Sequence, residues 1–353
     1  MQYPALIMDK AKIKHNTKVL SELANNHGIK VAGVTKVLSA LPDLAEAMLE
    51  GGAYALADSR IENLIKLKAF NVPKLLLRIP MLTQAADVVQ YADISLNSEI
   101  EVIKALNEAA KAKNKVHQII LMVDLGDLRE GVWYEKTLVY TDEIIKLDNI
   151  RLLGLGTNLT CYGGVIPSTE NLSTLVAIAE EIEGKYGIKL EVISGGNSSS
   201  VHLLLKNQMP KRVNQIRLGE AIVLGTESAY GERIEGTYND AFSFVAEIVE
   251  LKEKPSMPIG EIGMDAFGGK PVFQDNGIIK RAIVAAGRQD VKHDGLIPRD
   301  KGINILGASS DHMILDVTNA EKEYKVGDTI EFNVNYGALL ASATSEYVNK
   351  LVK

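Results

Sequence analysis

Eight short runs of strand-forming residues recur along the first two-thirds of the chain, and most of the intervals between them have helical patterns. In these intervals apolar residues return every three or four positions, and several intervals end on glycine, as helices often do. Strands that alternate with helices predict a parallel sheet, and eight such units predict that the sheet closes into a β/α barrel. The eight runs are 31–36, 53–57, 74–79, 92–96, 116–123, 150–156, 190–194 and 214–218.

The pattern changes after about residue 235, where strand-like segments are separated by turn signals such as QDNG and KVGD rather than by helices. We therefore predict a TIM-type β/α barrel over residues 10–235 and a C-terminal all-β domain over residues 236–353. The strand-like residues 1–9 precede the barrel and are expected to join the β domain. The strand-like segments of that domain are 242–255, 280–287, 303–309, 312–318 and 328–334.

Composition and charge exclude several classes of function. The net charge of -6 and the scattered Lys and Arg residues give no electrostatic reason to bind nucleic acid. No apolar run approaches the roughly 20 residues that cross a bilayer, and the first residues do not resemble a signal peptide. The single cysteine fits a reducing compartment, and no metal-binding Cys/His spacing is present. We expect a cytoplasmic protein without a metal site, a nucleic-acid partner or a membrane partner.

A lysine closes the first run. Lys36 ends the segment Lys30–Lys36, which places it at the carboxyl end of the first predicted strand. Barrels of this type build their active sites at that end of the strands. A lysine there can act as a catalytic amine or as the Schiff-base anchor of a carbonyl cofactor.

Two glycine-containing segments after the last predicted strands have the composition of a phosphate site. SGGNSSS (194–200) leads into a helical pattern, so it offers small hydroxyls and backbone N–H groups at a helix start. RLGEA (217–221) follows the eighth strand, and these two loops form the usual phosphate site of the fold. Taken alone, SGGNSSS is more often a capped loop. Together with Lys36, the two segments suggest pyridoxal 5'-phosphate (PLP), held by its phosphate and by a Schiff base.

Other polar residues near the strand ends admit two interpretations each. A buried Arg217 must meet acceptors or an anion, whatever its function. Arg129 is either a solvated loop charge or a site residue, and Cys161 is more often a packing residue than a nucleophile. His312 is either hydrogen-bonded to its neighbour at a strand entry or catalytic. Tyr347 is a packing residue or a cofactor contact.

Taken together, these segments resemble the PLP-dependent fold type III enzymes, the alanine racemase superfamily, over essentially the full chain. They are most similar to its ornithine racemase-like branch. The resemblance implies a barrel followed by a β domain, PLP as cofactor, and a homodimer whose β domains complete the partner's site. The segments that carry it are GVTKV (33–37), ADSRIENL (57–64), MVDLGDLREG (122–131), GTNLTCYGG (156–164), SGGNSSS (194–200), IRLGEAI (216–222), GEIGMDAFG (260–268) and GASSDHMILD (307–316).

The resemblance also implies roles for single residues around the cofactor. Lys36 matches the Schiff-base lysine, and Arg217 matches the arginine that faces the pyridine nitrogen. Ser198 and the backbone at Gly219 and Glu220 match the phosphate contacts.

Four further residues complete the expected cofactor contacts. Arg129 matches an arginine near the phenolic oxygen of the cofactor and the substrate carboxylate. Asn158 falls where alanine racemases carry a histidine that flanks the ring. Asn197, in the glycine-serine segment, and Tyr347, near the C-terminus, are the remaining candidates.

The chain departs from alanine racemases at two positions. Those enzymes carry a tyrosine four residues after the lysine, where this chain has Ala40. Their opposing catalytic tyrosine aligns near 260–268, where the nearest candidate is Asp265. The second catalytic base is therefore left among Asp265, Asp311 and His312.

The expected function is an amino-acid racemase, most similar to those that interconvert L- and D-ornithine by proton transfer between two bases on opposite faces of the α-carbon. Because a guanidinium at Arg217 cannot accept a proton, it would keep the pyridine ring neutral and favour proton return over elimination. The alternatives are an alanine or lysine racemase, a metal-dependent D-threonine aldolase-like lyase, and a non-catalytic PLP-homeostasis protein. The predicted C-terminal β domain counts against the last of these.

Overall fold

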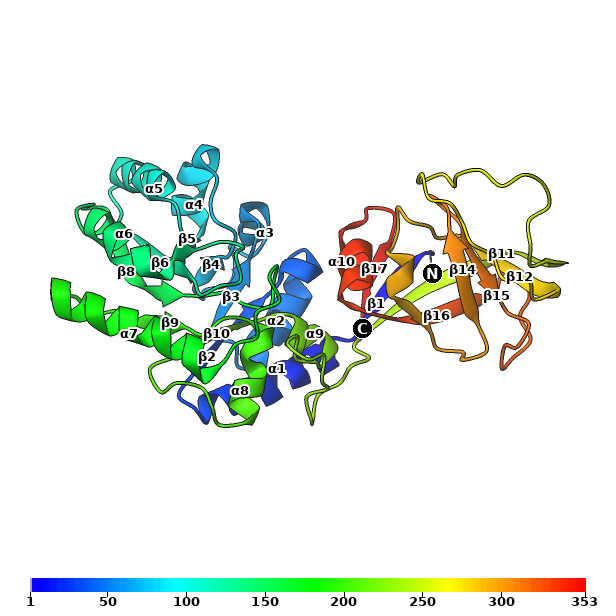
Figure 1. Cartoon of the computed structure of the whole chain (residues 1–353), viewed down its shortest axis with the longest axis horizontal. Coiled ribbons are helices and arrows are strands. Elements are labelled where there is room, and N and C mark those ends of the chain that lie inside the picture. Colours follow the sequence, from blue (N-terminus) through cyan, green and yellow to red (C-terminus); the bar gives the residue numbers. More distant parts are fainter. Residues whose placement is uncertain (1) are drawn as a thin grey trace. The chain divides into compact units, whose positions relative to one another are not determined.

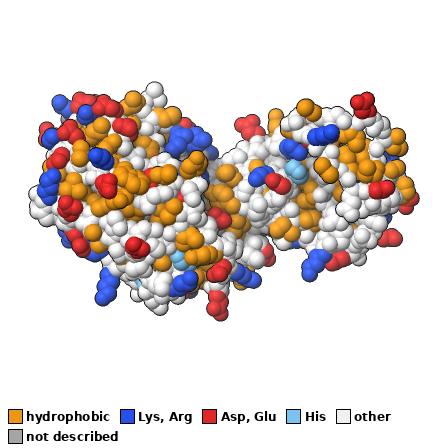
Figure 2. Space-filling view, in the orientation of Figure 1, with side chains coloured by type: hydrophobic (Ala, Val, Ile, Leu, Met, Phe, Trp, Pro, Cys, Tyr) orange, Lys and Arg blue, Asp and Glu red, His pale blue; other side chains and the backbone are white. Residues whose placement is uncertain are grey.

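The computed structural model describes residues 2–353, which form two compact units (Figure 1). The larger unit is Lys10–Asn239. The smaller unit combines the chain up to Asp9 with Asp240–Lys353. The division therefore falls four residues beyond the boundary expected after residue 235. Acidic and basic side chains are interspersed over the visible face of each unit (Figure 2).

The larger unit is a closed barrel of parallel strands. Hydrogen-bonded neighbours follow the order β5, β4, β3, β2, β10, β9, β8 and β6, and β6 pairs back with β5 to close the ring. The eight predicted strands are confirmed, each within three residues at its ends. They are β2 (Lys30–Val34), β3 (Ala55–Asp58), β4 (Lys74–Leu76), β5 (Ile94–Asn97), β6 (His117–Asp124), β8 (Ile150–Gly156), β9 (Val192–Ser194) and β10 (Gln215–Leu218). A short additional strand, β7 (Val132–Trp133), pairs with the end of β6.

Alternation along the strands separates the two faces of the barrel sheet. Ala32 and Val34 of β2 belong to a buried apolar cluster contributed by several strands. Gly33, between them, faces the opposite way, since a Cβ there would lie 3.1 Å from the Sδ atom of Met48 in the following helix. The other buried members of the cluster are Ala55, Ala57, Leu75, Ile94, Leu96, Ile120, Met122 and Leu153.

Helices follow the barrel strands and surround the sheet (Figure 1). The longest helix, α7 (Thr169–Tyr186), has clear start and stop signals in the sequence. Ser168 and Asn171 form a reciprocal capping box at its start, and Gly187 ends it with a φ of 66°. The helices are α1 (Lys10–Asn25), α2 (Pro42–Glu50), α3 (Ile61–Lys66), α4 (Ala85–Tyr91), α5 (Ile100–Ala112), α6 (Thr137–Ile144), α7 (Thr169–Tyr186), α8 (Val201–Leu205) and α9 (Glu220–Leu224), with single 3-10 turns η1 (Lys36–Leu38), η2 (Leu82–Gln84), η3 (Tyr134–Lys136) and η4 (Ser198–Ser200).

The smaller unit is built on a largely antiparallel sheet with the order β13, β16, β11, β12, β15 and β14. The N-terminal strand β1 pairs with β11 and with β17, as expected for a segment that joins this unit. Phe244 and Phe332 are fully buried in its core. The strands are β1 (Ala5–Met8), β11 (Phe242–Pro255), β12 (Ile278–Val284), β13 (Leu296–Pro298), β14 (Asn304–Ala308), β15 (Met313–Asp316), β16 (Thr329–Val334) and β17 (Asn349–Val352), and the 3-10 turn is η5 (His293–Gly295).

This unit also contains a helix that the sequence reading of the region did not anticipate. α10 spans Tyr336–Thr344 and begins at Asn335, whose side-chain oxygen accepts the N–H of Ala338 at 2.9 Å. Its buried face includes Leu339 and Ser342. The segment has only nine residues, too few for helical periodicity to stand out among the neighbouring strand patterns.

Candidate active site

Lys36 lies at the carboxyl end of the barrel strands. It is half-buried and begins η1, two residues after β2 ends. Thr35 beside it is fully buried, and its hydroxyl donates to Oδ2 of Asp58 at 2.7 Å. Its backbone N–H donates to the carbonyl oxygen of Ala57 at 2.9 Å. Burial raises the pKa of the Asp58 carboxyl. The backbone that carries Lys36 is therefore fastened to the end of the neighbouring strand β3.

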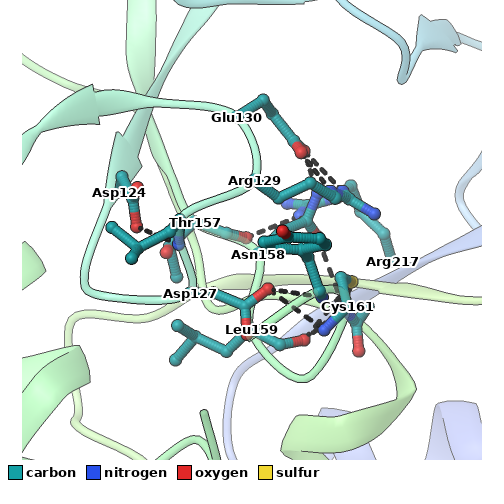
Figure 3. Close-up of polar contacts among 12 residues, drawn as sticks. Asp124, Asp127, Arg129, Glu130, Thr157, Asn158, Leu159, Cys161 and Arg217 are labelled. Atoms are coloured by element: carbon teal, nitrogen blue, oxygen red, sulfur yellow. Dashed lines mark hydrogen bonds and ion pairs between the residues drawn. The ribbon is translucent and has the colours of Figure 1, made fainter. Parts of the chain in front are cut away.

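Arg217 on β10 is buried, with 3% of its surface exposed. Its guanidinium is hydrogen-bonded to oxygen atoms that accept (Figure 3). Its guanidinium donates to the carbonyl oxygen of Thr157 at 2.7 Å, to Oδ1 of Asn158 at 2.9 Å, and to Oγ of Ser194. Burial lowers the pKa of Arg217 to about 10, so the side chain stays charged at neutral pH. The expectation that a buried arginine must meet acceptors is confirmed.

Asn158 connects Arg217 with a carboxylate that sequence reasoning had not assigned. Nδ2 of Asn158 donates to Oε1 of Glu130 at 2.6 Å. Glu130 also pairs with Arg129, whose terminal nitrogen lies 2.5 Å from Oε1 (Figure 3). The hydrogen-bonded ion pair with Glu130 raises the pKa of Arg129. The four side chains form a continuous chain of contacts from the loop after β6, through the loop after β8, to strand β10.

Asp127 fastens these two loops together. Its buried carboxylate accepts the backbone N–H groups of Cys161 at 3.1 Å, Tyr162 at 2.9 Å and Val165 at 3.1 Å. Burial works to raise the pKa of Asp127, but these N–H groups and that of Gly163 together lower it. Sequence reasoning missed this role, because nothing local to Asp127 indicates which distant backbone it will meet.

The expected phosphate loops meet at a serine hydroxyl. Oγ of Ser198 accepts the N–H groups of Gly219 at 3.4 Å and Ala221 at 3.1 Å, which join the segments after β9 and β10. Asn197 caps η4 by accepting the N–H of Ser199 at 2.8 Å. A Cβ at Gly219 would lie 3.2 Å from Cβ of Val34, so a side chain there would crowd the end of β2.

Asn197 also reaches back to the loop after β8. Its Nδ2 donates to the carbonyl oxygen of Leu159 at 3.1 Å and contacts Sγ of Cys161 at 3.3 Å. Burial raises the pKa of the Cys161 thiol, which disfavours the reactive thiolate. The structure therefore brings together, within the barrel, Lys36, Arg129, Asn158, Asn197, Ser198, Arg217, Gly219 and Glu220.

The candidates for the second base lie in the smaller unit. Oδ1 of Asp265 accepts the N–H groups of Phe267 at 2.9 Å and Gly269 at 2.8 Å, and these bonds lower the pKa of Asp265. Nδ1 of His312 lies 3.0 Å from Oδ1 of Asp311 at the turn between β14 and β15, where both side chains are exposed.

Tyr347, the last expected cofactor contact, also belongs to the smaller unit. It lies between α10 and β17 and is 67% exposed. Over residues 2–353, no group of three or more His, Cys, Asp and Glu side chains is arranged to hold a metal ion. None of the helices in this range has the length and apolar composition needed to cross a membrane.

Comparisons with known proteins agree with this architecture. The family model "Alanine racemase, N-terminal domain" matches residues 8–227. An ornithine racemase from Acetoanaerobium sticklandii is 51% identical over 349 residues, and a lysine racemase from Thermotoga maritima is 41% identical over 353 residues, with 99% of each chain covered in both cases. The solved alanine racemase from Bartonella henselae with covalently bound pyridoxal phosphate shares the fold at a TM-score of 0.75 and 17% identity, covering 100% of both chains.

A β/α barrel followed by a β unit, together with the family match over residues 8–227 and the full-length racemase relatives, identifies the class as PLP fold type III. Proteins of this class include the alanine racemases that match this fold. The chain belongs to the alanine racemase family. It is an amino-acid racemase, and therefore an isomerase.

Proposed function

We propose that the chain is a PLP-dependent ornithine racemase, which interconverts L- and D-ornithine in the cytoplasm. The single observation that supports the chemistry is that Lys36 follows β2, whose hydrogen-bonded neighbour β10 contains Arg217 and leads into the N–H groups that bond to Ser198. The substrate is proposed from the relative named ornithine racemase, which is 51% identical along the whole chain. The relative named lysine racemase is less similar, at 41%.

The residues present fit PLP. The N–H of Gly219 reaches Oγ of Ser198 at 3.4 Å, which is long for such a bond, so this donor can serve a stronger, anionic acceptor. Ser198, Gly219 and the backbone of Glu220 would hold the phosphate, Lys36 would bind the aldehyde, and Arg217 would face the ring nitrogen. Bound PLP supplies the electron-withdrawing group that acidifies the α-hydrogen of an amino acid.

The protein's own residues then divide the work of proton transfer. The amine of Lys36 takes or returns the α-proton on one face of the substrate, and a second group must act on the opposite face. Arg217 donates only, so it leaves the ring nitrogen unprotonated and limits side reactions. Arg129, kept charged by Glu130, is proposed to face the substrate carboxylate, and Asn158 to flank the ring.

We propose that the second base comes from the smaller unit of another copy in a homodimer. Asp265 is a weak base there, because two backbone N–H groups already stabilise its charged form. His312 is the better candidate, since Asp311 binds Nδ1 and leaves Nε2 for proton transfer. Tyr347, exposed on the same unit, remains a proposed cofactor contact.

The test is a racemisation assay with L-ornithine, alanine and lysine, with and without added PLP. We expect loss of optical rotation to be fastest with ornithine, and Lys36→Ala to abolish it. A Lys36→Ala protein with full activity would contradict the mechanism. Aldehyde release that requires a divalent metal would indicate a lyase instead, and PLP binding without turnover of any amino acid would indicate a PLP-homeostasis role.

A further inference from the structure

Six acidic side chains that are not exposed lie at, or soon after, the carboxyl ends of the barrel strands, and five of them already have hydrogen-bond donors. Glu220 is the exception: over residues 2–353 its carboxylate accepts no hydrogen bond and forms no ion pair. The five that are bonded are Asp58 (from Thr35 and Asn63), Asp124 (from the N–H groups of Gly126 and Leu128), Asp127 (from the loop after β8), Glu130 (from Arg129 and Asn158) and Glu227 (from the N–H groups of Ala229, Tyr230 and Glu232).

Glu220 lies beside the catalytic lysine. The strands β10 and β2 are hydrogen-bonded neighbours, with Leu218 paired to Gly33. Glu220 comes two residues after the end of β10, and Lys36 comes two residues after the end of β2. The contact continues one residue past the end of β10, because a Cβ at Gly219 would lie 3.2 Å from Cβ of Val34, the last residue of β2.

The surroundings of Glu220 disfavour its charged carboxylate unless a cation lies nearby. Burial raises the pKa of Glu220, and the negative charge of Glu227 raises it further. The positive charge of Lys36 is what opposes these two effects. An amine that accepts an α-proton must be uncharged when it does so. At that stage Lys36 no longer supplies its positive charge to Glu220.

We infer that Glu220 receives the distal ammonium of a diamino-acid substrate and so selects ornithine over neutral amino acids. The inference rests on the proposed function. Ornithine carries its second ammonium at the end of a short methylene chain, so its α-carbon can lie at Lys36 while the ammonium reaches the neighbouring segment. Protein donors already bind the other five carboxylates, so over residues 2–353 Glu220 is the one of the six without a hydrogen-bond donor.

The first test compares L-ornithine with L-norvaline, which has the same carbon chain but no distal ammonium. Glu220→Gln should lower kcat/KM for ornithine about 10- to 100-fold, mainly by raising KM, because a charge-assisted hydrogen bond is lost. The loss of kcat/KM with norvaline should be several-fold smaller than the loss with ornithine, because norvaline has no distal ammonium for Glu220 to bind. Glu99→Gln, which removes an exposed carboxylate after β5, is the matched control and should change neither substrate.

A second variant, Glu220→Asp, tests the inference if the Glu220→Gln protein folds poorly. Glu220→Asp retains the charge but withdraws it by one methylene, so it should favour the longer lysine and raise the lysine-to-ornithine ratio of kcat/KM several-fold. Equal losses for ornithine and norvaline in Glu220→Gln, or unchanged kinetics with ornithine, would overturn the inference alone. A native protein that fails to racemise ornithine would contradict the proposed function as well.

Discussion

At the scale of single residues, the amide of Asn158 has one orientation that satisfies both of its neighbours. Its Nδ2 faces the carboxylate of Glu130, so its Oδ1 faces the guanidinium of Arg217 (Figure 3). Rotating the amide by half a turn would place oxygen against oxygen and N–H against N–H. Glu130 therefore holds Asn158 in the state that accepts from Arg217.

This arrangement predicts that Glu130 supports the cofactor site without touching the reacting atoms. Glu130→Gln should weaken PLP binding about 10-fold, because the amide of Asn158 and the guanidinium of Arg129 lose their anionic partner. The measurement is a PLP titration of the cofactor-free protein by absorbance. Glu135→Gln, on the exposed η3, is the control. Unchanged affinity in Glu130→Gln would show that Asn158 is oriented without it.

At the scale of elements, the loops after β6 and β8 are held together by one buried carboxylate. Asp127 binds backbone N–H groups from residues more than thirty positions away. Arg129 and Asn158 sit on these two loops, so their separation depends on Asp127. These hydrogen bonds join the two connections to each other.

Replacing this carboxylate should change stability in a pH-dependent way. Asp127→Asn should cost about 1–3 kcal/mol at neutral pH, because N–H donors would then face an amide instead of an anion. The folded-state pKa of Asp127 is lowered, so its contribution is complete above the unfolded pKa of about 4 and is lost as the pH falls through the folded value. Urea unfolding at several pH values should show the gap between native protein and variant closing in acid. A gap that persists at low pH would contradict this account.

At the scale of the whole molecule, the N-terminal strand belongs to a unit whose other residues come from beyond the barrel. β1 pairs with β11 on one side and with β17 on the other. The strand β17 has β1 as its partner in the sheet topology of the described residues. The two chain ends are thus joined in one sheet although the barrel separates them in sequence.

Deletion of residues 2–9 should therefore release the C-terminal strand. We expect amide exchange in β17 to become roughly 100-fold faster at Asn349 and at the other N–H groups that point toward β1, because they lose their acceptors, such as the carbonyl oxygen of Pro4 for Asn349. Hydrogen-exchange mass spectrometry measures this directly. Exchange in the β2–β10 pair of the barrel is the internal control and should not change. Continued protection of Asn349–Val352 would mean that other contacts hold this strand.

Local patterns along the chain were enough to predict the barrel, because strand and helix periodicities arise from residues close in sequence. They gave the eight strands, the change to a β unit, the assignment of the N-terminal strand, and the positions of Lys36 and Arg217 at or near strand ends. The site assignments themselves came from the family resemblance and remain proposals. The short helix α10 and the strands β7, β13 and β17 were missed because none of them is long enough to show a period.

The sequence by itself thus determined which elements form and which face of the barrel carries the polar residues. Only the tertiary structure decided which of those residues are already bonded to one another. Glu130, Asp127 and Glu220 are alike in sequence, as acids that follow barrel strands by a few residues. Two of them are occupied by donors from distant loops, and Glu220 is not. That difference depends on long-range contacts, which the order of residues in a loop does not reveal.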